Sequence, residues 1–301
     1  MEVNFRAQQA ANKRKTFMLL ALFGVLTWAV LYAVLTYFGR GTTTNIVPIA
    51  VGIALISVWG SYYSSDKLVV TMTGAKQIQE SDNPKLFALI QEVCIASGLP
   101  MPKVAIVQDN APNAFATGRN PEHALIAFTT GILDAMTKDE LHGVTAHEMG
   151  HVKNRDTLVS AVAATTAGAI ALLSDFLMRM MFWGGGRRDS RNQQNPIALA
   201  VSLIVLILAP LAAMLLRAAI SRRREALADA TAVEFTKNPR GLREALEVLQ
   251  ANSSVVKQQS TAVAHLWIES PLDARTVSKF FATHPPLEER IALLRAMEGK
   301  N

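Results

Sequence analysis

The sequence contains few cysteines and few charged residues, and both shortages exclude whole classes of protein. Cys94 is the only cysteine among 301 residues, so an internal disulfide is impossible and a reducing compartment is compatible with the chain. Only 18% of the residues are charged, whereas 50% are hydrophobic, which is unusual for a soluble protein. The net charge of +6 is not accompanied by a nucleic-acid motif, so we expect no nucleic-acid partner.

The apolar residues are concentrated in four long runs, which predict membrane-spanning helices. A bilayer core of ~30 Å requires about 20 apolar helical residues. The runs at 17–38 and 46–63 contain no charge, and a seven-residue hairpin separates them. The runs at about 158–182 and 197–220 form a second pair, in which Asp175 and Arg179 can form an ion pair. A long buried helical hairpin in a soluble core is the alternative interpretation.

The basic residues near these runs predict the orientation of the chain. Four of them lie between positions 6 and 15, before the first run, and only Arg40 lies in the first hairpin. The positive-inside rule therefore places the N-terminus and residues 64–156 in the cytoplasm. The three arginines at 222–224 agree with this orientation, whereas the basic loop 184–195 does not. A second pair that is re-entrant or only partly inserted would remove the conflict.

The sequence thus divides into a transmembrane hairpin (1–63), a first polar part (64–156), a second apolar pair (157–220) and a second polar part (221–301). In the first polar part we expect a helix capped near Ser81 or Asp82. Strands are expected at 103–108, 113–118 and 123–130. A capping box at Thr137 and Glu140 starts the next helix. The second polar part predicts helices at 221–236, 239–252 and 285–298.

The helix that begins at Thr137 contains the segment TAHEMGH (145–151), which is a candidate zinc site. On a helix, His147 and His151 lie one turn apart on the same face, with Glu148 beside them. Such a motif also arises by chance, since it requires only three fixed residues. A catalytic zinc ion needs three protein ligands and one open position, so a third ligand must be found.

Acidic residues further along the chain can complete such a site. A glycine at position 154 and a third histidine at position 157 would define another class of zinc protease, but this chain has Asn154 and Thr157 there, so that class is excluded. Glu225, in the segment EALAD (225–229), can be the third ligand. Either Asp229 or Asp156 can accept a hydrogen bond from the free ring nitrogen of a ligand histidine. Glu148 would then act as the general base that takes a proton from the attacking water.

Several motifs in order resemble the HtpX family of membrane-bound zinc metalloproteases, which are related to the CAAX prenyl proteases. They are two N-terminal apolar runs, NAFATG (113–118), TTGIL (129–133), TAHEMGH, SRRREALADA (221–230) and THPPLEERI (283–291). The resemblance implies a mainly α integral membrane protein. It has transmembrane helices and a cytoplasmic α+β protease domain of the gluzincin type with a small sheet.

The resemblance also assigns roles to residues. It implies one Zn²⁺ per chain, bound by His147, His151 and Glu225, with Glu148 as the base. It places Asn113, Ala114 and Phe115 on an edge strand that pairs with an extended polypeptide substrate, and His284 and Arg290 near the active site. It implies a multi-pass protein of a bacterial-type inner membrane that degrades misfolded or damaged proteins under stress. An ATP-dependent membrane protease is an expected partner.

Three other functions remain open at this point. An intramembrane protease would hold its zinc inside the bilayer, whereas charged residues flank the motif here at 138–140 and 153–156. A CAAX prenyl protease would resemble a longer chain. A non-catalytic membrane scaffold would close its zinc site with a fourth protein ligand.

Overall fold

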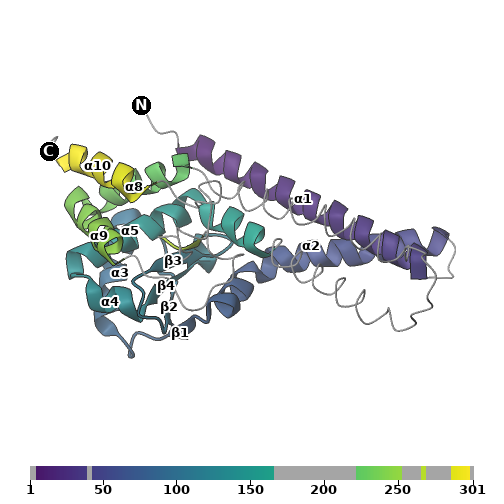
Figure 1. Cartoon of the computed structure of the whole chain (residues 1–301), viewed down its shortest axis with the longest axis horizontal. Coiled ribbons are helices and arrows are strands. Elements are labelled where there is room, and N and C mark those ends of the chain that lie inside the picture. The colour runs from purple at the N-terminus through teal and green to yellow at the C-terminus, as the bar shows by residue number, and fades with distance from the viewer. Residues whose placement is uncertain (1–4, 39–42, 166–221, 253–265, 269–285, 299–301) are drawn as a thin grey trace, which may run out of the picture.

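The computed structural model describes residues 5–38, 43–165, 222–252, 266–268 and 286–298 (Figure 1). Its N-terminal part alternates helices with short strands, and its C-terminal part is helical. The elements up to the second strand are α1 (Phe5–Phe38), α2 (Thr43–Thr73), β1 (Lys76–Ile78), α3 (Pro84–Ser97) and β2 (Lys103–Val107). They are followed by β3 (Ala114–Thr117), η1 (Pro121–His123), β4 (Leu125–Thr129), α4 (Thr130–Ala135), α5 (Lys138–Asn154), α8 (Arg222–Thr236), α9 (Pro239–Ala251) and α10 (Leu287–Glu298).

The four strands form one small sheet in the order β1-β2-β4-β3. The two central strands, β2 and β4, run parallel to each other, and β1 and β3 pair with them in antiparallel fashion. β2 to β4 confirm the three strands predicted from the sequence. β1 was not predicted, because its three residues are too few to show an alternating pattern. β3 forms one edge of the sheet, and this edge faces α5.

Helix α5 lies between the sheet and the C-terminal helices (Figure 1). It packs against β3, α3, α8 and α9. Its buried apolar residues Val144, Met149 and Val152 join one hydrophobic core with residues of all these elements. Burial on every side fixes the helix, and with it the motif that it carries, in a single position.

Two glycines allow α5 to approach its neighbours closely. A methyl group added at Gly143 would lie 2.5 Å from the backbone nitrogen of Leu242 in α9. At Gly150 it would lie 3.2 Å from the carbonyl oxygen of Ala228 in α8. Real side chains essentially never approach backbone as closely as the first distance, so Gly143 sets the spacing of α5 and α9.

The ends of the helices follow the residues that cap them. The predicted capping box of α5 is present: the Thr137 side chain accepts from the Glu140 backbone, and the Glu140 carboxylate accepts from the Thr137 N–H at 2.6 Å. The cap of α3 was predicted near Ser81 or Asp82 and lies one residue after Asp82. Asn83 caps this helix, because Pro84 occupies its first position and so places the cap one residue before it.

Helices α1 and α2 lie side by side and extend away from the sheet (Figure 1). They contain the first two predicted spans, 17–38 and 46–63. In the part of the chain that the structure describes, however, no helix has both the length and the apolar character needed to cross a membrane. These two spans are therefore not confirmed as such. The second predicted pair, at about 158–182 and 197–220, lies mostly outside the described residues.

Candidate metal centre

Helix α5 supplies two candidate ligands from one face. His147 and His151 lie one helical turn apart, and their Nε2 atoms are only 3.2 Å from each other. The rings meet edge to face, with centroids 4.7 Å apart. His147 is fully buried, and His151 is partly buried. The Nε2 atoms of the two rings therefore point toward the same place beside α5.

Helix α8 brings a carboxylate to the same point. The Glu225 oxygens lie 3.6 Å from His147 Nε2 and 3.8 Å from His151 Nε2. One ligand atom from each of the three residues lies within 4.8 Å of the other two. The sequence separates Glu225 from the histidines by more than seventy positions, but the packing of α8 on α5 brings them together.

The spacing of these three groups fits a tetrahedral metal ion. Two imidazole nitrogens that bind one zinc ion at the usual bond lengths lie about 3.3 Å apart, which agrees with the 3.2 Å between the two Nε2 atoms. Among the described residues, the cluster contains no fourth histidine, cysteine or acidic ligand, so one coordination position is left for water or substrate.

Asp229 orients the first histidine. Its Oδ1 lies 2.9 Å from His147 Nδ1, so this nitrogen carries the ring proton and Nε2 keeps its lone pair for a metal. Burial lowers the pKa of His147 to about 4, and the nearby Arg290 contributes to this effect. At neutral pH the ring is therefore uncharged, as a metal ligand must be.

Arg290, on α10, holds Asp229 in turn. Its Nε donates to Asp229 Oδ2 at 2.9 Å and its Nη2 donates to Oδ1 at 2.6 Å, which is a two-point ion pair. Burial would raise the pKa of Asp229, but the guanidinium of Arg290 lowers it to about 2. Both partners are almost fully buried. Arg290 thus supports His147 through Asp229, and its Nη2 also lies directly against the His147 ring, 3.3 Å from Nδ1. Its Nη1 lies 3.7 Å from Glu225.

Asp156 orients the second histidine. Its Oδ2 lies 3.2 Å from His151 Nδ1, so both acidic candidates for this supporting role lie against a histidine, one on each. Burial alone would lower the pKa of His151, but Glu225, Asp156 and Glu148 together raise it to about 9. A site that stabilises a protonated imidazole so strongly carries negative potential, and the same potential favours a divalent cation.

Glu148 lies next to the ligands, is buried, and is not one of the three converging groups. Burial raises the pKa of its carboxyl group to about 7, against the opposing charge of His151. A backbone hydrogen bond with Ala116 of β3 holds it. A carboxyl group with a pKa near neutrality can both accept and release a proton at physiological pH.

The edge strand β3 passes beside this carboxylate. The Asn113 carbonyl accepts from the Thr129 N–H at 2.9 Å, so the backbone of Asn113 faces β4. Because successive residues of a strand face opposite sides in the sheet plane, the backbone N–H and C=O groups of Ala114 and Ala116 face the outer edge of β3. The Asn113 side chain accepts from the Ala114 N–H, and the Ala114 carbonyl accepts from the Ile268 N–H at 2.9 Å. Residues 266–268 therefore lie along part of the outer edge.

The remaining predicted residues are placed as follows. Phe115 points away from the metal centre into a second core, where its ring packs edge to face on Trp267 with centroids 4.8 Å apart. His284 lies outside the described residues.

Sequence reasoning missed Asn12, which is fully buried and donates to Asp156 Oδ1 at 2.6 Å. No sequence pattern could have found it, because it precedes Asp156 by 144 positions.

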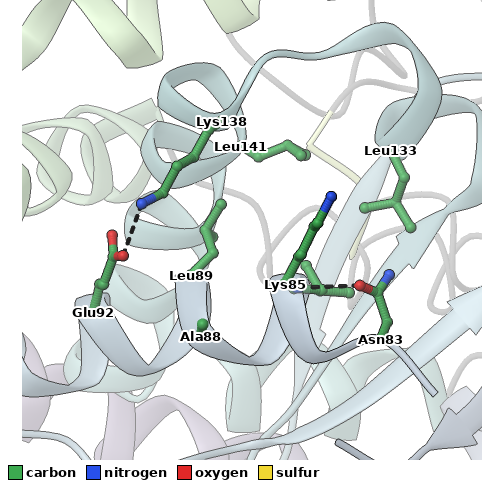
Figure 2. Close-up of a pocket in the computed structure, with 9 residues that line it drawn as sticks. Asn83, Lys85, Ala88, Leu89, Glu92, Leu133, Lys138 and Leu141 are labelled. Carbon is green, nitrogen blue, oxygen red and sulfur yellow. Dashed lines mark hydrogen bonds and ion pairs between the residues drawn. The ribbon is translucent and has the colours of Figure 1, made fainter. Parts of the chain in front are cut away.

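A separate pocket of about 450 Å³ lies between α3, α4 and the first half of α5 (Figure 2). Its lining is mainly apolar, and an exposed ion pair of 2.8 Å between Lys138 and Glu92 lies beside it. The lining residues are Asn83, Lys85, Leu86, Ala88, Leu89, Glu92, Leu133, Lys138 and Leu141. None of the groups of the metal centre is among them, so the pocket is not part of that centre.

Comparison with known proteins gives matches over nearly the whole chain. A family model described as peptidase family M48 matches residues 80–298. A protease HtpX homolog of Caldanaerobacter subterraneus subsp. tengcongensis is 42% identical over 292 residues, which are 96% of each chain. A protease HtpX homolog of Streptococcus gordonii is 43% identical over 295 residues, covering 96% of this chain and 99% of its own.

Among solved structures, the crystal structure of S. mikatae Ste24p is similar in fold, with a TM-score of 0.51 and 18% sequence identity. The match covers 96% of this chain and 66% of that chain. At this identity the likeness concerns the fold alone.

Proposed function

The chain belongs to peptidase family M48, among the HtpX proteases, and on this premise we propose that it is a zinc-dependent membrane endopeptidase acting on misfolded or damaged proteins. The observation that carries the zinc assignment is the convergence of His147, His151 and Glu225 beside Glu148. Two imidazoles and one carboxylate form a ligand set that zinc prefers in proteases.

The chemistry is hydrolysis of a peptide bond. A bound zinc ion supplies a water of lowered pKa and polarises the scissile carbonyl group. Glu148 removes the proton from the attacking water and later delivers it to the leaving amine. Asp229 and Asp156 keep both histidine rings in the tautomer that ligation needs, and Arg290 keeps Asp229 in place.

A scaffold function is disfavoured by the same site. A structural zinc site normally has four protein ligands, whereas three converge in the described part of this chain. A buried carboxyl group of raised pKa beside the open position is needed for proton transfer, and a structural site has no use for it. Chelation of zinc should therefore abolish cleavage of an unfolded protein such as casein. One zinc ion per chain without chelator-sensitive cleavage would support the scaffold instead.

We place the substrate along the outer edge of β3, in extended form. Backbone groups of Ala114 and Ala116 face this edge, and Ala116 reaches Glu148, so a strand added here would pass beside the base. Strand addition depends on backbone hydrogen bonds and therefore accepts many sequences, as quality control requires. A substrate strand also has to compete with Ile268 for the Ala114 carbonyl.

A peptide series tests this placement. A cleavable reporter peptide would be methylated at one backbone nitrogen at a time, next to the scissile bond. We expect methylation at alternate positions to abolish cleavage, because only every second residue donates to the neighbouring strand. Changes of the side chains at the same positions should have a much smaller effect. Equal sensitivity at all positions would contradict strand addition.

We assign the membrane anchor to α1 and α2. Many large apolar side chains on these two helices are exposed, and a patch of this kind on a protein favours contact with lipid or a partner. They are Phe17, Met18, Val25, Ile49, Val51, Ile53, Leu55, Ile56, Trp59, Tyr63 and Leu68. The basic residues before the first apolar run favour a cytoplasmic N-terminus. Extraction of membranes with alkaline carbonate should leave the protein in the membrane fraction, and its release would contradict the anchor.

The quality-control role concerns the natural substrates. We propose that they are misfolded or damaged membrane and cytoplasmic proteins, and that an ATP-dependent membrane protease shares them. Membranes from cells with the wild-type protein or the Glu148→Ala variant would be compared under heat or envelope stress. We expect misfolded proteins to accumulate with the variant. An unchanged membrane proteome would contradict this role and would leave the peptidase activity itself intact.

A further inference from the structure

The N-terminal helix α1 reaches the metal centre through one buried polar side chain. Asn12 is fully buried where α1 packs against the end of α5. Its Nδ2 donates to the Asn154 carbonyl at 2.9 Å and to Asp156 Oδ1 at 2.6 Å. An amide nitrogen has two hydrogens, so these two bonds use its full donor capacity.

The second bond continues to a metal ligand. Asp156 uses its other oxygen, Oδ2, for His151 Nδ1 at 3.2 Å. A continuous path of two hydrogen bonds thus runs from α1 through the Asp156 carboxylate to His151. Asp156 is almost fully buried, and two cations lie further from it than Asn12 does: Arg224, 3.9 Å from its Oδ1, and Lys15 of α1, which interacts with it electrostatically.

Asp156 needs such support because helix α5 has already ended before it. Arg155 closes the helix in a left-handed conformation with φ of 58°, and a new helical segment begins at Asp156, so the carboxylate is carried by the first residue after the break between the two helical segments. Asn12 binds both the last carbonyl of α5 and the carboxylate, and it thereby fixes the one relative to the other.

We propose that Asn12 is a positioning residue for the metal: it holds Asp156, Asp156 holds the His151 ring, and the affinity for zinc therefore depends on α1. This inference rests on the proposed zinc function and extends it to the N-terminal helix. The helix that we assign to the membrane anchor thus supports the metal centre through Asp156. Displacing α1 from α5 would weaken zinc binding without any change in the ligands themselves.

The chemistry of the site requires an amide at this position. Alanine would leave one Asp156 oxygen and the Asn154 carbonyl buried without this donor. Aspartate has nearly the same shape but would place a second carboxylate at hydrogen-bonding distance from Asp156. Groups that orient metal ligands typically change metal affinity by about 10–100-fold when removed. Because Asn12 acts through one intermediate residue, we expect the lower end of this range.

The test measures zinc affinity by competition with a chelator, using the full-length protein in detergent. We expect zinc to bind about tenfold more weakly to Asn12→Ala, and at least as weakly to Asn12→Asp. Thr16→Val is the matched control: Thr16 is equally buried one turn further along α1, and its hydroxyl donates to the Asn12 carbonyl at 3.0 Å. This control should keep the wild-type affinity. Melting of the metal-free proteins monitors folding in parallel.

A double-mutant cycle with Asp156→Ala separates positioning from a merely structural role. If Asn12 acts through Asp156, Asn12→Ala should cost zinc affinity in the wild-type background and almost none in the Asp156→Ala background. An equal loss in both backgrounds, or an unchanged affinity of Asn12→Ala, overturns the inference. Failure of the wild-type protein to bind zinc would instead overturn the proposed function, so the two failures are distinguishable.

Discussion

The buried ion pair of Asp229 and Arg290 should be needed both for stability and for metal binding, and Asp229→Asn tests this. The substitution keeps the shape of the side chain but removes its charge and one of its two acceptor oxygens. In the wild-type protein both oxygens accept from Arg290, and one of them also contacts His147. The single amide oxygen can replace either Oδ1, which faces His147 and Arg290 Nη2, or Oδ2, which faces Arg290 Nε, and the NH2 group then faces a donor at the other position. The variant therefore leaves a buried guanidinium without its charged two-point partner and weakens the support of the His147 ring.

The magnitude follows from the burial of the pair. Asp229 and Arg290 are 4% and 2% exposed, and breaking a buried ion pair by removing one partner costs about 3–5 kcal/mol. Glu225 lies 3.7 Å from Arg290 and retains part of the compensating charge, so we expect the lower end. A loss of about 3 kcal/mol lowers the melting temperature of a chain of this size by about 6–12 °C. Zinc should bind about 10–100-fold more weakly.

The assay is thermal melting of the detergent-solubilised protein, metal-free and zinc-loaded, with zinc affinity measured by chelator competition. The metal-free arm isolates the ion pair, and the zinc-loaded arm adds the effect on the ligand. Glu92→Gln is the control, since its carboxylate pairs with Lys138 at 2.8 Å on the exposed surface. An exposed pair contributes at most about 1 kcal/mol. If Asp229→Asn melted and bound zinc like this control, the account of the buried pair would be refuted.

Two further predictions concern buried positions on α5 and α3. Gly143→Ala should destabilise the protein by about 1–3 kcal/mol, because the new methyl group would meet the Leu242 backbone at 2.5–2.7 Å. The control Gly52→Ala, where no atom lies within 4 Å, should melt no lower than wild type in the same thermal assay. Burial raises the pKa of the Cys94 thiol from 9.0 to about 11, so alkylation at pH 8 should be about a hundredfold slower than in the unfolded chain. Mass spectrometry of iodoacetamide-treated protein checks this, and equal rates would contradict the burial of Cys94.

The main parts of the site could be predicted from the sequence because local patterns encode them. The spacing of His147 and His151 has meaning only on a helix, and the capping box at Thr137 shows where that helix begins. The requirement for a third ligand then directs attention to the few acidic residues on a later helix, among them Glu225. The strands β2 to β4 show the alternation or the β-rich composition that short buried strands need.

Other features depend on contacts between distant parts of the chain and carry no local signal. Asn12 lies in an ordinary helical segment, and only the packing of α1 against α5 brings it to Asp156. The contact of Ile268 with Ala114 likewise joins segments more than 150 positions apart. From the sequence, either Asp229 or Asp156 could accept the hydrogen bond from the ring of a ligand histidine. The structure shows that each histidine has its own acceptor, because the two rings present their Nδ1 atoms to different neighbours.

The central claim is that Glu148 is the base beside a zinc ion held by His147, His151 and Glu225. Glu148→Gln tests it most directly, because an amide of the same size cannot accept the proton and does not belong to the converging ligands. Zinc content and the rate of casein cleavage would be measured on the same preparations. The account predicts one zinc ion per chain, as in the wild type, with cleavage slower by about 10²–10⁴-fold. Cleavage at the wild-type rate by the zinc-loaded variant would contradict it.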